Sequence, residues 1–410
     1  MVFSGQSDRR SFLKASVLGT AGLSVGAGLN RRVRAAWTDG TQINPAVPND
    51  RIVCCHDNAM NPSWSGQCND GQDLDCVGRG HEVNSNFPRT MDHSFTEQND
   101  LLDTARMQAD LDAMARSLTK VEDPVQAWRT LFMKPAGKSW DQVRVAVKVD
   151  ANGLVLPHIP IVDKVCRELH RLGVPFGNIV LFDGEAYTFD PDAGKVVSSV
   201  VYYYRPYLGN GLPDGIVVSS YYDGLGGTIM ADIPAPMEGA YPCAADIANG
   251  KIDILINLAC SKPHGSVFGG AALCLKNHVG GTFLRQFPEN PFHGYDWCLY
   301  MLAVNKSSAV LGGSPPRQQL CIVDAVWSAH CCGPLGFGDV VGGQDRQPNR
   351  LIMGTFAPLV DVVTIKILKS GHHKDYLQYD KERPLVVRFL TEFGYPESMK
   401  SMDHIEVNPS

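Results

Sequence analysis

The sequence predicts a three-layer α/β protein, with a mostly parallel sheet flanked by helices and an irregular, cysteine-rich N-terminal arm before it. Residues 143–149 (VRVAVKV) and 178–182 (NIVLF) have the length and β-branched composition of buried strands. Between them, residues 157–172 have helical spacing of apolar side chains, and Gly173 is a typical helix stop. A strand, a helix and a strand in this order form a right-handed unit with parallel strands.

The N-terminus has the pattern of an export signal. Residues 7–14 read SDRRSFLK, an apolar Gly/Ala-rich run covers residues 15–29, and VRAA at 33–36 is a small-residue cleavage region. We therefore expect residues 1–35 to be a twin-arginine signal peptide and the mature chain to be periplasmic or secreted. The twin-arginine translocase carries folded proteins, which favours a bound metal or organic cofactor whose identity is unknown.

Charge and hydropathy limit the partners. The chain of 410 residues has 37 Lys+Arg and 43 Asp+Glu, and removing residues 1–35 takes away six basic and one acidic residue. The remaining 31 and 42 give a net charge near −11, which argues against nucleic acid or anionic membrane as partners. No segment reaches the run of about 18 apolar residues that a stable membrane span requires.

Residues 36–140 are expected to form the arm and two helices. Residues 37–91 are rich in Asn, Asp, Gly, Pro and Ser, and residues 100–118 and 125–133 have helical patterns. In an oxidising compartment the arm cysteines are expected to form disulfides, and a metal or cluster site that also uses His56 and His81 is the alternative. These cysteines are Cys54, Cys55, Cys68 and Cys76. The sequence has no C-x-x-C, which excludes a thioredoxin-like motif and a C-x-x-C-H haem attachment.

The α/β domain is expected to cover residues 141–405. Residues 186–250 suggest a β-rich insertion or long ordered loops, in which Tyr202, Tyr203 and Tyr204 serve packing. The apolar run 252–258 predicts a buried strand that ends just before Lys262. Further strands are predicted at 320–324 and 351–354, and helices at 300–310, 360–368 and 385–392.

Residues 256–281, INLACSKPHGSVFGGAALCLKNHVGG, are the strongest candidate site. The segment leaves a strand end, where open α/β sheets bind ligands, and its glycines allow the backbone to approach a ligand closely. Lys148 lies at the carboxyl end of another predicted strand, residues 143–149, and Asp150 follows directly. The turn after that strand lacks G-x-G-x-x-G, so Asp183 after the next strand does not indicate a dinucleotide site.

Several of these motifs together resemble the family named domain of unknown function 362. They are the strand ending in Lys148, the KPH and LKNHVGG segments, and the strand ending in IVDA, and the match covers about residues 141–405. The chain differs from that family at Asp150, where asparagine is common, at residues 355–358, which lack an aspartate, and in lacking ferredoxin-like cysteine runs. The order of His264, Gly269-Gly270, Lys276 and Gly280 is also similar to lactate racemase-like enzymes, which hold a nickel-pincer nucleotide, although the spacing differs.

These patterns assign expected roles. His264 is the candidate general acid or base, with Lys262, Lys276 and Asp150 as further catalytic candidates. Lys148, Asn277 and Gly280 are expected to bind the cofactor or an anionic group, and Asp324 and Asp361 to orient these groups or ligate a hard cation.

The leading hypothesis is an exported enzyme with an anionic substrate and redox or isomerase chemistry. The alternatives are a non-catalytic binding or cofactor-assembly protein and a structural envelope protein. Substitutions in residues 256–281 distinguish the structural envelope protein from the other two classes, because in a structural protein they should affect folding alone.

Overall fold

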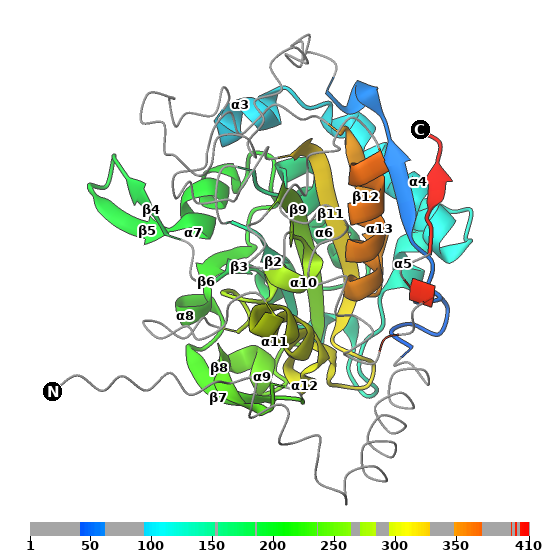
Figure 1. Ribbon diagram of the computed structural model, residues 1–410. Helices are drawn as coiled ribbons and strands as arrows, with labels where there is room; N and C mark the ends of the chain where they lie inside the picture. Colours follow the sequence, from blue (N-terminus) through cyan, green and yellow to red (C-terminus); the bar gives the residue numbers. More distant parts are fainter. Residues whose placement is uncertain are drawn as a thin grey trace, which may run out of the picture.

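The computed structural model describes residues 42–61, 94–151, 155–184, 187–235, 237–263, 271–283, 295–328, 348–370, 395, 398–399 and 402–409. One large sheet organises these residues (Figure 1). In spatial order its strands are β13 (Ile405–Val407), β1 (Val53–His56), β12 (Arg350–Gly354), β11 (Gln318–Ser328), β9 (Ile254–Pro263), β2 (Val145–Val149), β3 (Ile179–Asp183) and β6 (Val217–Ser220), and the short β10 (Ala271–Ala272) pairs with β9.

The sheet is mostly parallel, which confirms the predicted α/β class. Strands β11, β9, β2, β3 and β6 run parallel to one another, whereas β12 is antiparallel to both β11 and β1. In chain order the parallel strands are β2, β3, β6, β9 and β11. The sheet therefore grows from β2 to β6 on one side and then from β9 to β11 on the other. The direction of growth reverses between β2 and β9, the place where doubly wound sheets bind their ligands.

Helices cover both faces of the sheet. On one face lie α4 (Thr104–Thr119), α5 (Pro124–Leu131), α6 (Ile159–Arg171) and α7 (Ser199–Tyr204). The other face, in front in Figure 1, carries α9 (Ala245–Ala248), α10 (Cys274–Asn277), α11 (Tyr295–Lys306), α12 (Ser308–Leu311) and α13 (Ala357–Ser370). Side chains of β2 alternate between the faces: Val145, Val147 and Val149 join the first core and Ala146 the second.

Local signals start and stop the long helices near the predicted positions. The side chain of Asp103 accepts a hydrogen bond from Arg106 N and caps α4, which ends at Lys120 in a left-handed conformation. Asp123 caps α5 in the same way, and a proline in its first turn suits the helical φ. Helix α6 also has a proline in its first turn, and Gly173 follows its C-cap. The predicted strands and helices at residues 100–118, 125–133, 157–172 and 178–182 are thus present.

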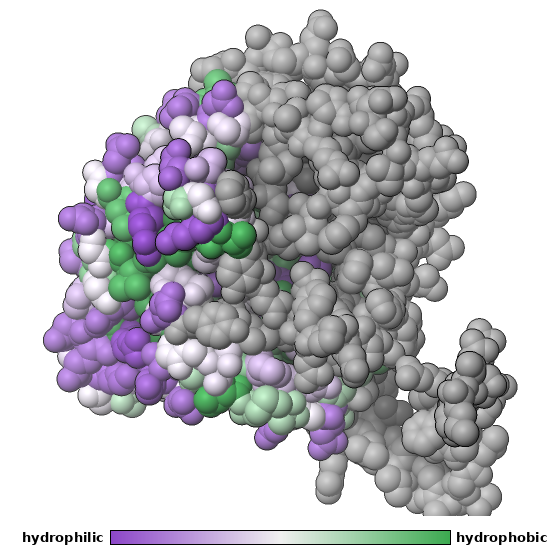
Figure 2. Space-filling model, turned by 90° about the vertical axis from the view of Figure 1, so that its left-hand side faces the viewer, coloured by the Kyte–Doolittle hydropathy of each residue, from purple (hydrophilic) through white to green (hydrophobic). Residues whose placement is uncertain are grey.

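The chain between β3 and β9 is not a single insertion. Within it β6 joins the main sheet. The three tyrosines expected to serve core or edge packing belong to α7, and Tyr204 is fully buried in the core. Two small hairpins lie outside the sheet, β4 (Tyr187–Asp190) with β5 (Lys195–Ser198), and β7 (Thr228–Ile233) with β8 (Gly239–Ala244); α8 (Tyr221–Gly224) follows β6. Figure 2 shows this side of the molecule, where apolar residues are interspersed with hydrophilic ones.

Shorter helices complete the description. They are α3 (Phe95–Asp100) and the 3₁₀ turns η1 (Asn58–Met60), η2 (Trp140–Gln142), η3 (Phe176–Asn178) and η4 (Arg205–Tyr207). The helix expected at 385–392 lies outside the described residues. None of the described helices combines the length and the apolar character needed to cross a bilayer.

The prediction that disulfides staple the N-terminal arm is wrong for the two arm cysteines that the structure describes, Cys54 and Cys55. Cys54 and Cys55 are free, buried thiols in β1, which belongs to the main sheet. Consecutive strand residues point to opposite faces, so the two thiols enter different apolar cores, Cys54 toward α13 and Cys55 toward α4. All eight cysteines within the described ranges are free, and Cys68, Cys76 and His81 lie outside them.

Candidate functional site

The candidate site lies where the carboxyl ends of β2 and β9 meet helix α10. Strand β2 contributes Lys148 and is followed by Asp150, whereas β9 contributes Lys262 and α10 carries Lys276 and Asn277. Strand β9 runs through Lys262 to Pro263, further than the apolar run predicts. The structure thus brings together five of the residues expected from the sequence, at the reversal point of the sheet.

Lys148 is a buried cation, and all three N–H donors of its ammonium group have acceptors inside the protein. Its side chain is 2% exposed, and Nζ lies 2.7 Å from Asp183 Oδ1, 2.8 Å from Asn277 Oδ1 and 2.6 Å from the Val149 carbonyl oxygen. An ammonium group has three protons, so these acceptors satisfy it. Gly281 packs on this side chain, and a Cβ there would lie 1.7 Å from Lys148 Cε. Lys148 therefore holds the framework of the site.

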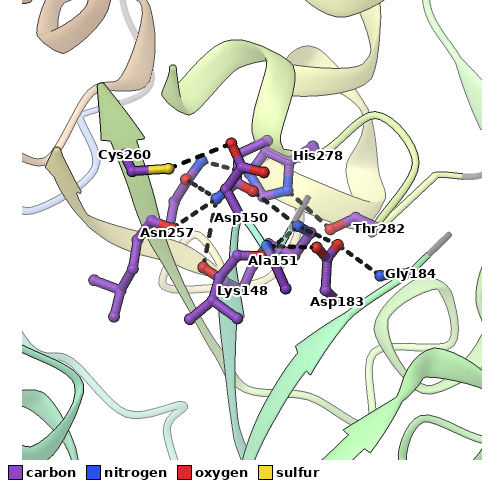
Figure 3. A network of polar contacts seen from close by, with 12 residues as sticks. Lys148, Asp150, Ala151, Asp183, Gly184, Asn257, Cys260, His278 and Thr282 are labelled. Atoms are coloured by element: carbon purple, nitrogen blue, oxygen red, sulfur yellow. Dashed lines mark hydrogen bonds and ion pairs between the residues drawn. The ribbon is translucent and has the colours of Figure 1, made fainter. Parts of the chain in front are cut away.

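Asp183 ties the ends of β2 and β3 together. Its Oδ2 accepts a hydrogen bond from Ala151 N at 2.7 Å and its Oδ1 one from Gly184 N at 2.6 Å, as Figure 3 shows. With Lys148 as a third partner, three of the roughly four acceptor positions of the carboxylate are used within the protein.

A buried amide and imidazole network fixes α10 on β9. Asn277 Nδ2 donates to Asn257 Oδ1 at 2.8 Å and to the Leu258 carbonyl at 3.1 Å, and Asn257 Nδ2 lies 3.1 Å from His278 Nε2. His278 also contacts Thr282 Oγ1 at 2.8 Å and Gln318 Oε1 at 2.5 Å. Burial, with Lys148 adding to it, lowers the pKa of His278 to about 4 against the opposing effect of Gln318. The ring is neutral near pH 7 and serves structure.

Lys262 and Asp150 form an ion pair beside this network. Their Nζ and Oδ1 atoms are 3.1 Å apart, and the side chains are 1% and 14% exposed. Burial opposes ionisation of Asp150, but Lys262, Lys148 and Lys276 outweigh it and hold its pKa below the usual range. Burial likewise works against the charge of Lys262, and Asp150 more than offsets it, so the lysine pKa is raised. Both groups are therefore charged at neutral pH.

Cys260 is a neutral neighbour of this pair. Its Sγ donates to the Val155 carbonyl at 3.1 Å and lies 3.7 Å from Asp150 Oδ2 (Figure 3). Burial raises the pKa of this thiol well above its ordinary value. Because the thiolate is the reactive form, Cys260 is not a nucleophile here.

Three lysines and two carboxylates of the described residues meet in the site. The lysines are Lys148, Lys262 and Lys276, and the carboxylates belong to Asp150 and Asp183. Lys276 is half-buried, in contrast to the other two lysines. Lys276 is therefore the most exposed of the three lysines.

The remaining predicted residues have other surroundings. His264 lies outside the described residues, one position after Pro263. Gly280 has φ +85° and donates its N–H to the Phe283 carbonyl at 2.6 Å, and its own carbonyl oxygen packs against Gly184. It therefore shapes the turn after α10, and the packed backbone leaves no room for a Cβ at Gly184.

Asp324 and Asp361 lie on opposite faces of the sheet. Asp324 Oδ2 accepts from His158 N at 2.8 Å and lies 2.6 Å from His158 Nδ1, at the start of α6. Asp361 accepts from Cys274 N and Leu275 N, both at 2.9 Å, at the start of α10. Each carboxylate fixes the start of a helix, and the role of orienting the site groups or ligating a hard cation stays a prediction for both.

The sequence interpretation gave no role to Asn257 and His278, which lie within the candidate segment, or to the supporting residues Asp183 and Gln318 outside it. Asn257 gave a signal, since it is an amide inside the apolar run 252–258 and therefore needs a buried partner. Gln318 gave no such signal in the sequence, because its partner His278 lies 40 residues away in the chain. Tyr203, expected to serve packing, lies close enough to Lys262 for the ammonium to influence its pKa, which burial raises.

No family model matches the sequence, and neither a curated protein nor a solved structure is similar enough to it to count as a match.

Proposed function

We propose that the chain is an exported enzyme that binds a small anionic substrate at the carboxyl ends of β2 and β9. One observation carries the proposal: among the described residues, three lysines, Lys148, Lys262 and Lys276, gather at the reversal point of the sheet. Open α/β sheets bind ligands at this point, and buried charge acts through a low dielectric. A phosphate or carboxylate group is the ligand that this charge favours.

The proposed roles differ among the three lysines. Lys276 binds the anion directly, because it is half-buried and its helix is fixed on the sheet by the Asn277 network. Lys262, held by Asp150, contributes a second charge from β9. Lys148 keeps β2, β3 and α10 together. His264, next to the end of β9, remains the proposed acid or base.

The resemblance to the domain of unknown function 362 family supports the fold and the position of the site, whereas the reaction type is proposed on other grounds. The twin-arginine pattern supports a metal or organic cofactor acquired before export, and the motif order similar to lactate racemase-like enzymes supports isomerase chemistry, with redox chemistry as the other proposed class. Elemental analysis, absorbance and intact mass of the natively exported protein identify such a cofactor. A stoichiometric metal, or a mass lost on denaturation, is the expected result.

Anion binding is tested by calorimetry with inorganic phosphate, a nucleoside monophosphate and a small dicarboxylate. We expect at least one of them to bind wild-type protein and Lys276→Ala to weaken binding by about tenfold, as loss of a charged hydrogen bond predicts. Lys251→Ala is the matched control, since Lys251 is 60% exposed and pairs with Asp246 outside the site. Equal losses in the two variants, or no binding of any probe, would contradict the proposal.

The second candidate is a non-catalytic binding or cofactor-assembly protein. It is favoured by the state of the described groups, because Asp150 and Lys262 are charged and Cys260 is protonated near pH 7. Proton transfer then depends on His264. If His264→Ala leaves turnover of an identified substrate unchanged while Lys276→Ala abolishes binding, the binding function is the correct one.

Periplasmic export by the twin-arginine route is part of the proposal and is tested separately. Replacing both Arg9 and Arg10 by lysine keeps the charge but removes the guanidinium groups of the motif. We expect the full-length precursor to accumulate in the cytoplasm. Unchanged amounts of processed protein in the periplasm would exclude the route.

A further inference from the structure

A second group of chemically active side chains lies at the edge of the sheet, away from the candidate site. Strand β13 pairs in parallel with β1, and Cys54 is aligned with Glu406. Figure 1 shows the two strands side by side, with β13 in red. His404 precedes Glu406 by two positions, so the two side chains leave the chain on the same side. A thiol, an imidazole and a carboxylate therefore converge here from the two ends of the described chain.

The donor atoms are close enough for one ion. One ligand atom from each of Cys54, His404 and Glu406 lies within 4.8 Å of the others. Around a tetrahedral Zn²⁺ with bonds of about 2.0–2.3 Å, neighbouring ligand atoms are roughly 3.5 Å apart. Small side-chain rotations bridge this difference, since Glu406 is 50% and His404 20% exposed.

We propose that Cys54, His404 and Glu406 bind a divalent transition-metal ion such as Zn²⁺. Sulfur and imidazole ligands select such an ion over Mg²⁺ or Ca²⁺, which prefer sites made of oxygen alone. Three protein ligands leave a fourth position for water. The site is independent of the proposed anion site, because β12, β11 and β9 lie between β1 and β2.

The surroundings of His404 and Cys54 support the assignment. His404 Nδ1 lies 3.0 Å from Asp403 Oδ1, the carboxylate contact that orients a metal-binding imidazole and leaves Nε2 to the ion. Nε2 lies 2.8 Å from Glu406 Oε2, so the second ring nitrogen already faces a ligand of the ion. Arg350 Nη1 lies 3.5 Å from Cys54 Sγ and 3.4 Å from Glu406 Oε1. This guanidinium group contacts two of the three proposed ligands and must move aside when the ion binds.

The test is a titration of the full chain, freed of metal by a chelator under reducing conditions, with Zn²⁺ against a chromophoric chelator and with Co²⁺. We expect one ion per chain and a sulfur-to-cobalt charge-transfer band. His404→Ala and Cys54→Ala should each weaken Zn²⁺ binding by more than about tenfold, and the second should abolish the band. His170→Ala is the control, because this histidine stacks on Phe176 on the opposite face and should leave both readouts unchanged.

Glu406→Gln guards against loss of folding, since its side chain is half-exposed and its shape is preserved. It should weaken Zn²⁺ binding while circular dichroism stays that of the wild type. In addition, Zn²⁺ should raise the melting temperature of wild-type protein and not that of His404→Ala. Absence of stoichiometric binding, or binding and a cobalt band that the three ligand substitutions leave unchanged, would overturn the assignment.

Discussion

At the scale of single residues, buried polar side chains decide which groups of the site are charged. Lys148 and Asp183 pair at 2.7 Å with almost no exposure, so each stabilises the charge of the other. His278 has no carboxylate partner and contacts Gln318 and Thr282 instead, which leaves its ring neutral. A neutral imidazole beside Lys148 avoids adding a further buried cation. The same principle predicts how acid acts on the protein.

We predict that His278 makes the folded state sensitive to mild acid. Its pKa is about 4 in the folded state and 6.5 as the ordinary value, so between these values the unfolded chain binds more protons. The contribution of His278 to the free energy of unfolding is therefore fully present above pH 6.5. It decreases as the pH falls toward 4, by about 3 kcal/mol in total. Urea unfolding of wild type and His278→Gln at a series of pH values measures this contribution.

The comparison removes the contributions that the two proteins share. Burial raises the pKa of Asp361 to about 7, against its two backbone hydrogen bonds, and this acts in the opposite direction in both proteins. The difference in stability between wild type and His278→Gln should therefore shrink as the pH falls from 6.5 to 4. A constant difference across that range would mean that His278 is not held neutral.

At the scale of elements, the four-residue helix α10 positions the functional side chains although it is too short to be stable alone. Asp361 of α13 binds its first two N–H groups, and Asn257 of β9 donates to the Cys274 carbonyl at 2.9 Å. Long-range contacts thus replace the internal hydrogen bonds that a longer helix would have. The position of Lys276 depends on them.

We predict that Asp361→Ala weakens anion binding as well as stability. The substitution leaves two buried N–H groups without their acceptor, at a cost of about 2 kcal/mol. Helix α10 then loses its fixed position, and the affinity for the anion of the proposed site should fall although Lys276 is intact. Urea unfolding and calorimetry measure the two effects.

Asp103→Ala is the matched control for a lost helix cap. Asp103 accepts from Arg106 N at 2.9 Å at the exposed start of α4, so its loss should cost about 1 kcal/mol and leave anion affinity unchanged. If both variants lose affinity in proportion to their stability, α10 has no special role in positioning Lys276.

The elements that the sequence predicts are those whose pattern is local. β2, α6 and β3 follow from apolar periodicity and from Gly173, and the strand ends correctly brought Asp150 near Lys262. β1 was missed because a four-residue strand has no periodicity of its own, and its partners β12 and β13 lie some 300 and 350 residues further along the chain.

The roles of Asp324 and Asp361 were not predictable for a related reason. Sequence position places a carboxylate at or near a strand or helix end, but it does not say which helix start lies opposite. That information depends on packing between elements, as in the contact of Asp324 with His158 across 166 residues. Strand ends can therefore be predicted to gather, whereas the partner of each side chain cannot.

At the scale of the whole molecule, the two edges of the sheet differ in how they are formed. At one edge β6 follows its neighbour β3 closely in the chain. At the other edge β13 returns from the C-terminal part of the chain to cover β1, and Ile405 N donates to the Ile52 carbonyl at 2.8 Å. An uncovered edge strand is a template for pairing with other chains. β13 is thus expected to protect β1, whose residues are mainly apolar and buried.

We predict that deleting residues 402–410 destabilises the protein and promotes association. The deletion removes the parallel pairing of β13 with β1 and exposes the edge backbone from Val53 to Cys55. It also removes the Val407 side chain from the apolar core and exposes the core residues that it covers. Burial of one valine side chain alone contributes about 1.5 kcal/mol, to which the lost hydrogen bonds add. Thermal unfolding and light scattering measure the two consequences. His404→Ala with Glu406→Gln retains the strand but removes two of the proposed metal ligands, so without metal it should associate no more than the wild type does. Increased association of this variant would show that side chains, rather than strand pairing, protect the edge.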